Sequence, residues 1–195
     1  MTRRGPNPLP RLPPPAFGRS LTRRRLGIVL LALLATAVLA VLDRQVDGAA
    51  AGDDWRRYHG QSYRVVRVID GDTFDLAVPD RGEQITRVRL WGVDTPELAK
   101  PDGREAEPYA IEAAARTRTL TEGRAITLYL EPHRHRGRFG RLLAHAELPD
   151  GTLLNKRLIE EGLSKADHRW SHGKIEPYQA AEDRARAAGV GLWSR

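Results

Sequence analysis

The feature that most constrains the fold is the order of short β-type and helical segments after residue 60. Runs of β-branched and apolar residues, bounded by Gly, Pro or Asp, predict five short strands. The expected strands are residues 62–69, 73–78, 85–90, 126–130 and 142–148. Five short strands with one helix after the third and further helices at the end are typical of a small closed β-barrel capped by helices.

Three helices complete the expected order. Across residues 105–120, small or apolar residues recur with the 3.6-residue period of an amphipathic helix. A shorter helix is expected between Thr152 and Gly162, and a last one over residues 177–188, ahead of a glycine. We therefore expect an α+β domain, mainly β, in which three helices cap a five-stranded barrel over residues 61–195.

An uninterrupted apolar run, residues 26–42, precedes this domain. At ~1.5 Å per residue, about 17 helical residues span roughly 26 Å, enough to cross the hydrocarbon core of a bilayer. An Arg triplet at 23–25 predicts that the N-terminus stays in the cytoplasm and that the domain lies outside it, anchored to the cell membrane by one transmembrane helix. The alternative is a signal peptide cleaved near the small residues 49–51, which would make the domain secreted.

The segments beside the apolar run explain the basic composition. Residues 1–25, rich in Pro and Arg, are expected to be a disordered tail, and residues 43–60 a linker. Because residues 1–50 contain eight Arg and two Asp, they carry +6 of the formal net charge of +7. The rest of the chain is nearly neutral, so overall basicity does not identify a nucleic-acid partner. The absence of Cys excludes disulfides and thiolate metal sites.

Two acidic phrases begin some twenty residues apart. One, containing Asp72, opens the second expected strand, and the other, containing Asp94 and Glu97, follows the third. If these strands pair as a hairpin, the start of one and the end of the other share an edge, which brings the three carboxylates together. Such a cluster needs a cation, and oxygen ligands without Cys or His suit Ca²⁺.

The expected calcium site has a defined division of roles. Asp72 and Asp94 are expected to bind Ca²⁺ directly, with the carbonyl of Thr95 as a further ligand. Glu97, slightly further out, is expected to hold and deprotonate a metal-associated water. Any one of these carboxylates alone is more often a solvated loop residue, so the hypothesis depends on the set.

The order and spacing of four segments, 69–73, 89–97, 138–141 and 191–194, resemble those of the staphylococcal nuclease family. The resemblance covers roughly residues 61–195. It implies an oligonucleotide-binding-type barrel, a Ca²⁺ cofactor, and cleavage of DNA and RNA that leaves 3′-phosphates. It also implies that Arg89 and Arg141 bind the phosphate, with Glu97 as general base. Arginine suits this role because its planar fork donates two parallel hydrogen bonds to phosphate.

Three further residues are expected to contact substrate, and two of them depart from the family pattern. Arg138 belongs to a basic run, Phe139 replaces a common tyrosine, and His168 stands where the family often has a tyrosine near the base. Both rings can stack on a base but lack a phenol hydroxyl. Gly137 stands where many members carry an acidic residue, which changes how the loop carrying Arg141 is braced.

Two other classes of protein compete with a nuclease. A catalytically inactive barrel that binds nucleic acid or protein at the membrane is one, and a tethered assembly protein with a relic motif is the other. A binder has no need for carboxylates beside two arginines, because acidic groups repel the backbone it holds. All five expected catalytic side chains are present. We therefore expect a monomeric calcium-dependent phosphodiesterase.

Overall fold

The computed structural model describes residues 28–38 and 53–194, which belong to two units. Residues 28–38 form an exposed helix inside the predicted apolar span; the rest of that span, the predicted tail 1–25 and residues 43–52 lie outside the described residues. Among the described residues, no helix has both the length and the hydropathy needed to cross a membrane.

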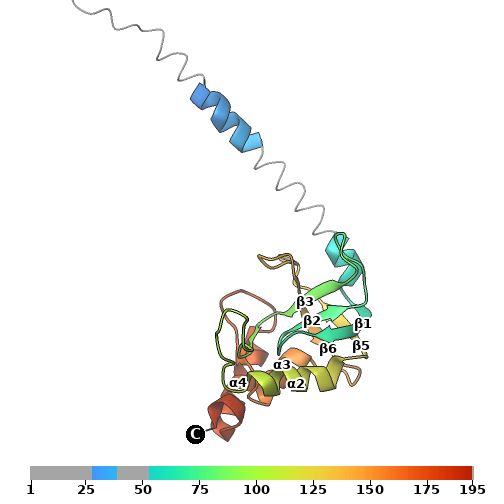
Figure 1. Cartoon of the computed structure of the whole chain (residues 1–195), viewed down its shortest axis with the longest axis vertical. Coiled ribbons are helices and arrows are strands. Elements are labelled where there is room, and N and C mark those ends of the chain that lie inside the picture. Colours follow the sequence, from blue (N-terminus) through green and yellow to red (C-terminus); the bar gives the residue numbers. More distant parts are fainter. Residues whose placement is uncertain (1–27, 39–52, 195) are drawn as a thin grey trace, which may run out of the picture. The chain divides into compact units, whose positions relative to one another are not determined.

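Five strands close into a barrel in the order β1-β2-β3-β6-β5 (Figure 1). Their bounds are Gln61–Val68 for β1, Thr73–Leu76 for β2, Thr86–Leu90 for β3, Ala125–Tyr129 for β5 and Leu142–Glu147 for β6. All neighbouring pairs are antiparallel except β3 and β6, which run parallel. The mixed α+β class and the five-stranded barrel expected from the sequence are confirmed.

Alternation along the strands explains why they close around one core. In β3 every second side chain is buried, as the sequence Thr-Arg-Val-Arg-Leu requires of a strand with one apolar face. The fully buried Phe74, Leu76, Val88, Ile126 and Leu128 fill the barrel interior. Each such side chain contributes roughly 1.5–3 kcal/mol by leaving water.

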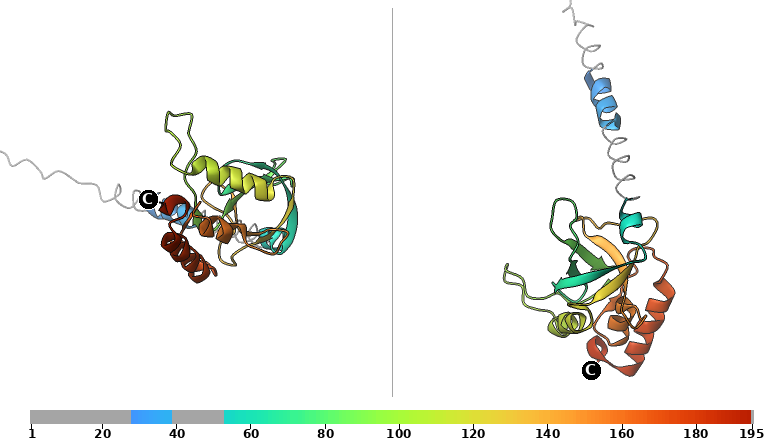
Figure 2. Two further views of the ribbon diagram at one scale, coloured as in Figure 1. Left: turned by 90° about the horizontal axis from the view of Figure 1, so that it is seen from below. Right: turned by 90° about the vertical axis from the view of Figure 1, so that its right-hand side faces the viewer.

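Three helices gather at one end of the barrel: α2 (Ala110–Thr121), α3 (Leu154–Glu160) and α4 (Ile175–Ala188) (Figures 1 and 2). A two-stranded sheet of β4 (Val93–Asp94) and β7 (Lys165–Ala166) and the short 3₁₀ helix η1 (Gly191–Trp193) complete the elements. The buried Asn155 fixes α3 to the barrel, because its amide donates to the carbonyl of Trp91 and accepts from the N–H of Ala146.

Two boundaries differ from those expected. Helix α2 begins at Ala110 rather than near residue 105, since Tyr109 has a left-handed backbone conformation that stops the helix from extending toward the N-terminus. Residues 53–58, expected to be linker, form a helix at the opposite end of the barrel from α2, α3 and α4 (Figures 1 and 2). Its Tyr58 is fully buried and hydrogen bonds to Thr86, so the folded unit begins upstream of residue 61.

Candidate active site

The turn between β1 and β2 supplies the first carboxylates of the site. Asp70 accepts a hydrogen bond from the N–H of Asp72 at 3.0 Å, which shapes the turn. Gly71 packs against α2 and Thr95 so closely that an added Cβ would lie 2.8 Å from the Thr95 Cβ. A side chain at position 71 would therefore push the two acidic segments apart.

Asp72 and Asp94 converge on the guanidinium of Arg89. The Thr95 hydroxyl and N–H both donate to Asp72 Oδ2, at 2.9 and 3.2 Å. Arg89 contacts the same oxygen, and its Nη2 lies 3.4 Å from Asp94 Oδ1. The antiparallel register that pairs Thr73 with Arg89 produces this meeting, because it places the start of β2 beside the end of β3.

Burial shapes the electrostatics of this cluster. Burial lowers the pKa of Arg89, although the charges of Asp94 and Asp70 act in the opposite direction. Burial likewise raises the pKa of Asp70 against the influence of Thr73 and Arg89. An ionised carboxylate with little access to water needs a nearby positive charge, and Arg89 supplies one here.

Arg141 lies on the neighbouring strand edge, next to Arg89. The parallel register pairs Arg89 with Leu143, and Arg141 directly precedes β6. Its Nη1 is 3.5 Å from the hydroxyl of Thr73, which itself donates to Asp72. Two guanidinium groups thus lie at the carboxylates, with Arg89 paired to Asp72 and Asp94 and Arg141 contacting the hydroxyl of Thr73.

Glu97 lies apart from this cluster. Its carboxylate is 59% exposed and pairs with Lys100 at 3.0 Å. Its backbone exchanges hydrogen bonds with Glu107, which fixes the loop to the entry of α2. The structure records no contact of its carboxylate with Asp72 or Asp94 in the part of the chain that it describes.

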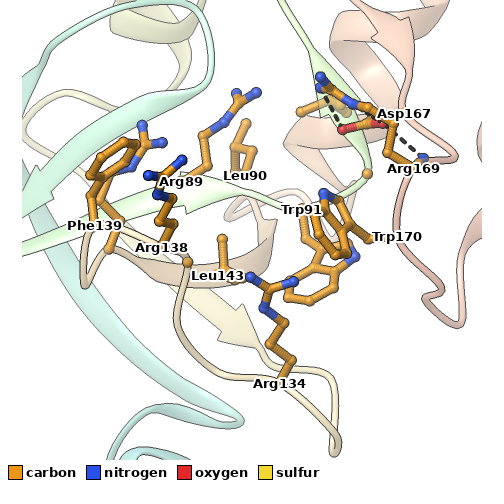
Figure 3. A pocket seen from close by; sticks show the side chains of 14 residues that line it. Arg89, Leu90, Trp91, Arg134, Arg138, Phe139, Leu143, Asp167, Arg169 and Trp170 are labelled. Carbon is orange, nitrogen blue, oxygen red and sulfur yellow. Dashed lines mark hydrogen bonds and ion pairs between the residues drawn. The ribbon is translucent and has the colours of Figure 1, made fainter. Parts of the chain in front are cut away.

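A pocket of about 240 Å³ opens beside Arg89 and Arg141 (Figure 3). Its wall includes five arginines and three aromatic rings, namely Arg89, Arg134, Arg138, Arg141 and Arg169 with Trp91, Phe139 and Trp170. Arg134 lies over the ring of Trp170, 4.3 Å from its centroid. Phe139 is 77% exposed, and the guanidinium of Arg138 lies 5.7 Å from its ring centroid.

The loop that carries Arg141 is braced from behind. Gly137 donates to the carbonyl of Arg141 at 2.9 Å, so the glycine at this position still closes the loop through its backbone. Arg136 donates to the carboxylates of Asp54 and Asp80 and to the carbonyl of Gly140. Arg136 therefore braces the loop that carries Arg141.

Sequence reasoning did not identify Arg169 and Trp170 as residues of this pocket. Arg169 pairs with Asp94 Oδ2 at 3.3 Å and with Asp167 at 2.8 Å, and Trp170 follows it. His168 was expected to contact substrate, yet it is not among the residues that line the pocket. Asp167 accepts hydrogen bonds from the backbone N–H and the Nε of Arg169, and this local turn holds the Arg169 side chain where it reaches Asp94. The adjacent basic and aromatic residues Arg169 and Trp170 were the signal in the sequence that could have indicated a substrate contact.

Comparison with known proteins identifies the family. A family profile described as "Staphylococcal nuclease homologue" matches residues 87–195. The chain belongs to the staphylococcal nuclease family. It is 32% identical over 168 residues to a thermonuclease of Staphylococcus intermedius, covering 84% of this chain and 95% of the relative.

Other members of the family are similar to shorter parts of the chain. A thermonuclease of Staphylococcus hyicus is 33% identical over 135 residues, covering 69% of this chain and 76% of the relative. The endonuclease YncB of Bacillus subtilis (strain 168) is 31% identical over 131 residues, covering 66% of this chain and 60% of the relative. Arg89, Asp94 and Arg141 lie inside the segment matched by the family profile, whereas Asp72 precedes it.

Proposed function

We propose that this protein is a nuclease that hydrolyses phosphodiester bonds of DNA and RNA with Ca²⁺ as cofactor. The observation that carries the proposal is the convergence of Asp72 and Asp94 on Arg89, beside Arg141 and an arginine-lined pocket. Family membership and the similarity to thermonucleases support it.

The donor set suits a hard cation. Asp72 is 5% exposed, and its carboxylate and that of Asp94 face the same guanidinium, so negative charge and oxygen donors are concentrated at one point. Asp72, Asp94 and the carbonyl of Thr95 would hold Ca²⁺. Bound there, the ion would supply positive charge against which a phosphodiester can approach the carboxylates.

The arginines are proposed to bind the phosphate that reacts. Attack on a phosphodiester increases the negative charge on the non-bridging oxygens, and fixed guanidinium groups stabilise that charge. Arg89 is held by two carboxylates, whereas Arg141 has one 3.5 Å contact with Thr73. Arg141 can therefore donate two parallel hydrogen bonds to a phosphate.

Glu97 is proposed as the general base. Its carboxylate accepts the proton from the attacking water as the water oxygen bonds to phosphorus and the P–O5′ bond breaks. The leaving 5′ oxygen takes a proton from solvent, so the products are a 3′-phosphate and a 5′-hydroxyl. An exposed position with one lysine as its partner leaves this carboxylate able to reorient. Because Glu97 lies apart from Asp72 and Asp94, its side chain reorients toward them when substrate binds.

The aromatic part of the pocket is proposed to hold an unpaired base. Phe139 and Trp170 are exposed rings beside Arg138 and Arg134, and bases stack on such rings regardless of sequence. A base inside a duplex has no free face, so single strands should be cut faster than duplexes.

We also propose that residues 26–42 anchor a monomeric enzyme in the cell membrane, with the nuclease domain outside the cytoplasm. The Arg triplet at 23–25 and the apolar run support this topology. Protease added to spheroplasts should degrade the domain. Protection of the domain, with digestion of the N-terminal tail alone, would reverse the topology.

The function is tested by incubating the purified protein with single-stranded DNA, duplex DNA and RNA, with Ca²⁺ or with a calcium chelator. Cleavage in Ca²⁺ that stops in chelator is the expected result. Cleavage that continues undiminished in chelator would overturn the metal assignment. Binding without cleavage under every condition would identify an inactive nucleic-acid-binding barrel.

A further inference from the structure

A second cluster of metal-binding side chains lies outside the nuclease site. Glu131 lies two residues after the end of β5, His145 belongs to β6, and His172 lies in the loop before α4. One donor atom from each lies within 4.8 Å of the other two. None of the three contributes to the pocket that contains Arg89 and Arg141.

The cluster is already close to the spacing that a small metal ion needs. Glu131 Oε1 is 3.0 Å from His145 Nε2, and it also accepts the N–H of Gly173 at 2.8 Å. Ligands of a tetrahedral ion with bonds of about 2.0–2.2 Å stand roughly 3.4 Å apart. Glu131 and His145 meet this spacing, and His172 needs a shift of little more than 1 Å.

The imidazoles are in the protonation state that metal binding requires. Burial lowers the pKa of His145 to about 4, and it also lowers the pKa of His172. Both rings are therefore neutral at pH 7, so a metal ion does not have to displace a proton from an imidazolium to bind. The Tyr178 hydroxyl, 2.8 Å from His145 Nδ1, can accept a hydrogen bond from the Nδ1–H group when Nε2 binds a metal.

The surroundings leave one side of the cluster open. A cavity of about 500 Å³ borders Glu131, His145 and Lys174, so an ion and a water ligand have a path to the side chains. Two imidazoles, one carboxylate and an open position form a donor set typical of Zn²⁺. Ca²⁺ takes six to eight oxygen ligands, so it is a poor match for this cluster.

We propose that Glu131, His145 and His172 form a binding site for Zn²⁺, separate from the calcium site of the nuclease. The ion would join the end of β5, the middle of β6 and the loop 167–174. Near its start, that loop also carries Arg169, which pairs with Asp94 of the nuclease site. The zinc site would therefore stabilise the loop that reaches the carboxylates of the nuclease.

The test uses the full-length protein in detergent, stripped of metal by chelator and kept in excess Ca²⁺ to fill the carboxylate site. Co²⁺ is the spectroscopic probe, because its visible bands report four-coordinate imidazole ligation, and Zn²⁺ is measured by its displacement of Co²⁺. One equivalent of Co²⁺ should bind, and one equivalent of Zn²⁺ should displace it. Zn²⁺ should also raise the Tm of the protein.

Two variants and one control decide the outcome. Glu131→Gln, which keeps an acceptor for Gly173, and His172→Gln should each weaken Zn²⁺ affinity at least about 100-fold and abolish the rise in Tm. His168→Gln removes a histidine of the same loop outside the cluster and should bind as the wild type does. If His172→Gln does not fold, Glu131→Gln alone decides. The absence of four-coordinate Co²⁺ bands in the wild type, or unchanged affinity in Glu131→Gln, would overturn the proposal.

Discussion

Arg136 and Asp54 form a buried ion pair that joins two segments 82 residues apart. Arg136 Nε donates to Asp54 Oδ2 at 2.7 Å, and the two side chains are 11% and 7% exposed. Asp80 accepts from the same guanidinium at 2.6 Å, so one arginine is shared by two carboxylates. The pair connects the helix of residues 53–58 with the loop that leads to Arg141.

Replacing Arg136 by Leu should destabilise the fold, because two carboxylates would stay buried without their partner. The expected loss in free energy of unfolding is roughly 3–5 kcal/mol. It should lie toward the lower end, since Arg81 is 3.7 Å from Asp54 and offsets part of the charge. Urea denaturation measures it. Arg104→Leu, which breaks the exposed pair with Asp102, is the matched control and should change the denaturation midpoint little.

The same ion pair makes a prediction about where the folded domain starts. A fragment of residues 53–195 should unfold cooperatively and cut single-stranded DNA. A fragment of residues 61–195 lacks Asp54 and Tyr58, which leaves Arg136 partly unpaired and opens a cavity against Thr86. Its denaturation midpoint should be far lower. Equal midpoints for the two fragments would show that the helix of residues 53–58 contributes nothing.

The barrel could be predicted from sequence because its signals are local. The alternation of Arg with Val and Leu in the sequence of β3 marks a strand within a few residues of its observed position. Gly162 and Gly189 likewise mark the ends of helices α3 and α4. The helix of residues 53–58 has no such signal, because its stability depends on Asp54 meeting a residue far along the chain. The start of α2 was misplaced since Tyr109 takes a left-handed conformation that no periodicity reveals.

The candidate site divides in the same way. The meeting of Asp72 and Asp94 follows from pairing adjacent strands, which is a short-range inference. The contributions of Arg169 and Trp170 depend on the path of loop 167–174 across the barrel, and a single sequence does not specify that path. The exposed position of Glu97 likewise results from a loop held to α2 rather than to a strand.

Acid stability should depend on Asp75, whose side chain is 1% exposed between Arg67 and Arg87. Burial alone would raise its pKa, but the two arginines outweigh burial and lower the pKa below 3.8. A carboxyl group whose pKa is lower in the folded state than in the unfolded state stabilises the fold at pH values above its unfolded-state pKa. This contribution should be lost as pH falls below about 3.8. Asp75→Asn should flatten that decline in urea denaturation, whereas an unchanged decline would exclude Asp75 as its source.

Glu97→Gln tests the general base. The amide keeps the size of the side chain but cannot take a proton from water, so kcat should fall about 10²–10⁴-fold. Binding of single-stranded DNA should change little, because the carboxylate is exposed and Glu97 does not line the pocket of Arg89 and Arg141. Glu105→Gln, in the same loop, is the control and should keep the wild-type kcat. Near-wild-type turnover in Glu97→Gln would remove Glu97 from the mechanism.

Arg141→Ala tests transition-state stabilisation. Among residues 28–38 and 53–194, the side chain makes a single 3.5 Å polar contact, with Thr73, so its loss should leave Tm nearly unchanged. Loss of one fixed charge at the reacting phosphate should lower kcat about 10²–10³-fold, while KM moves much less. Arg138→Ala, three residues earlier in the same loop, should instead raise KM, because that guanidinium lies beside Phe139 in the base pocket. Equal effects of the two variants on kcat would show that Arg141 contributes general attraction for nucleic acid and no specific stabilisation of the reacting phosphate.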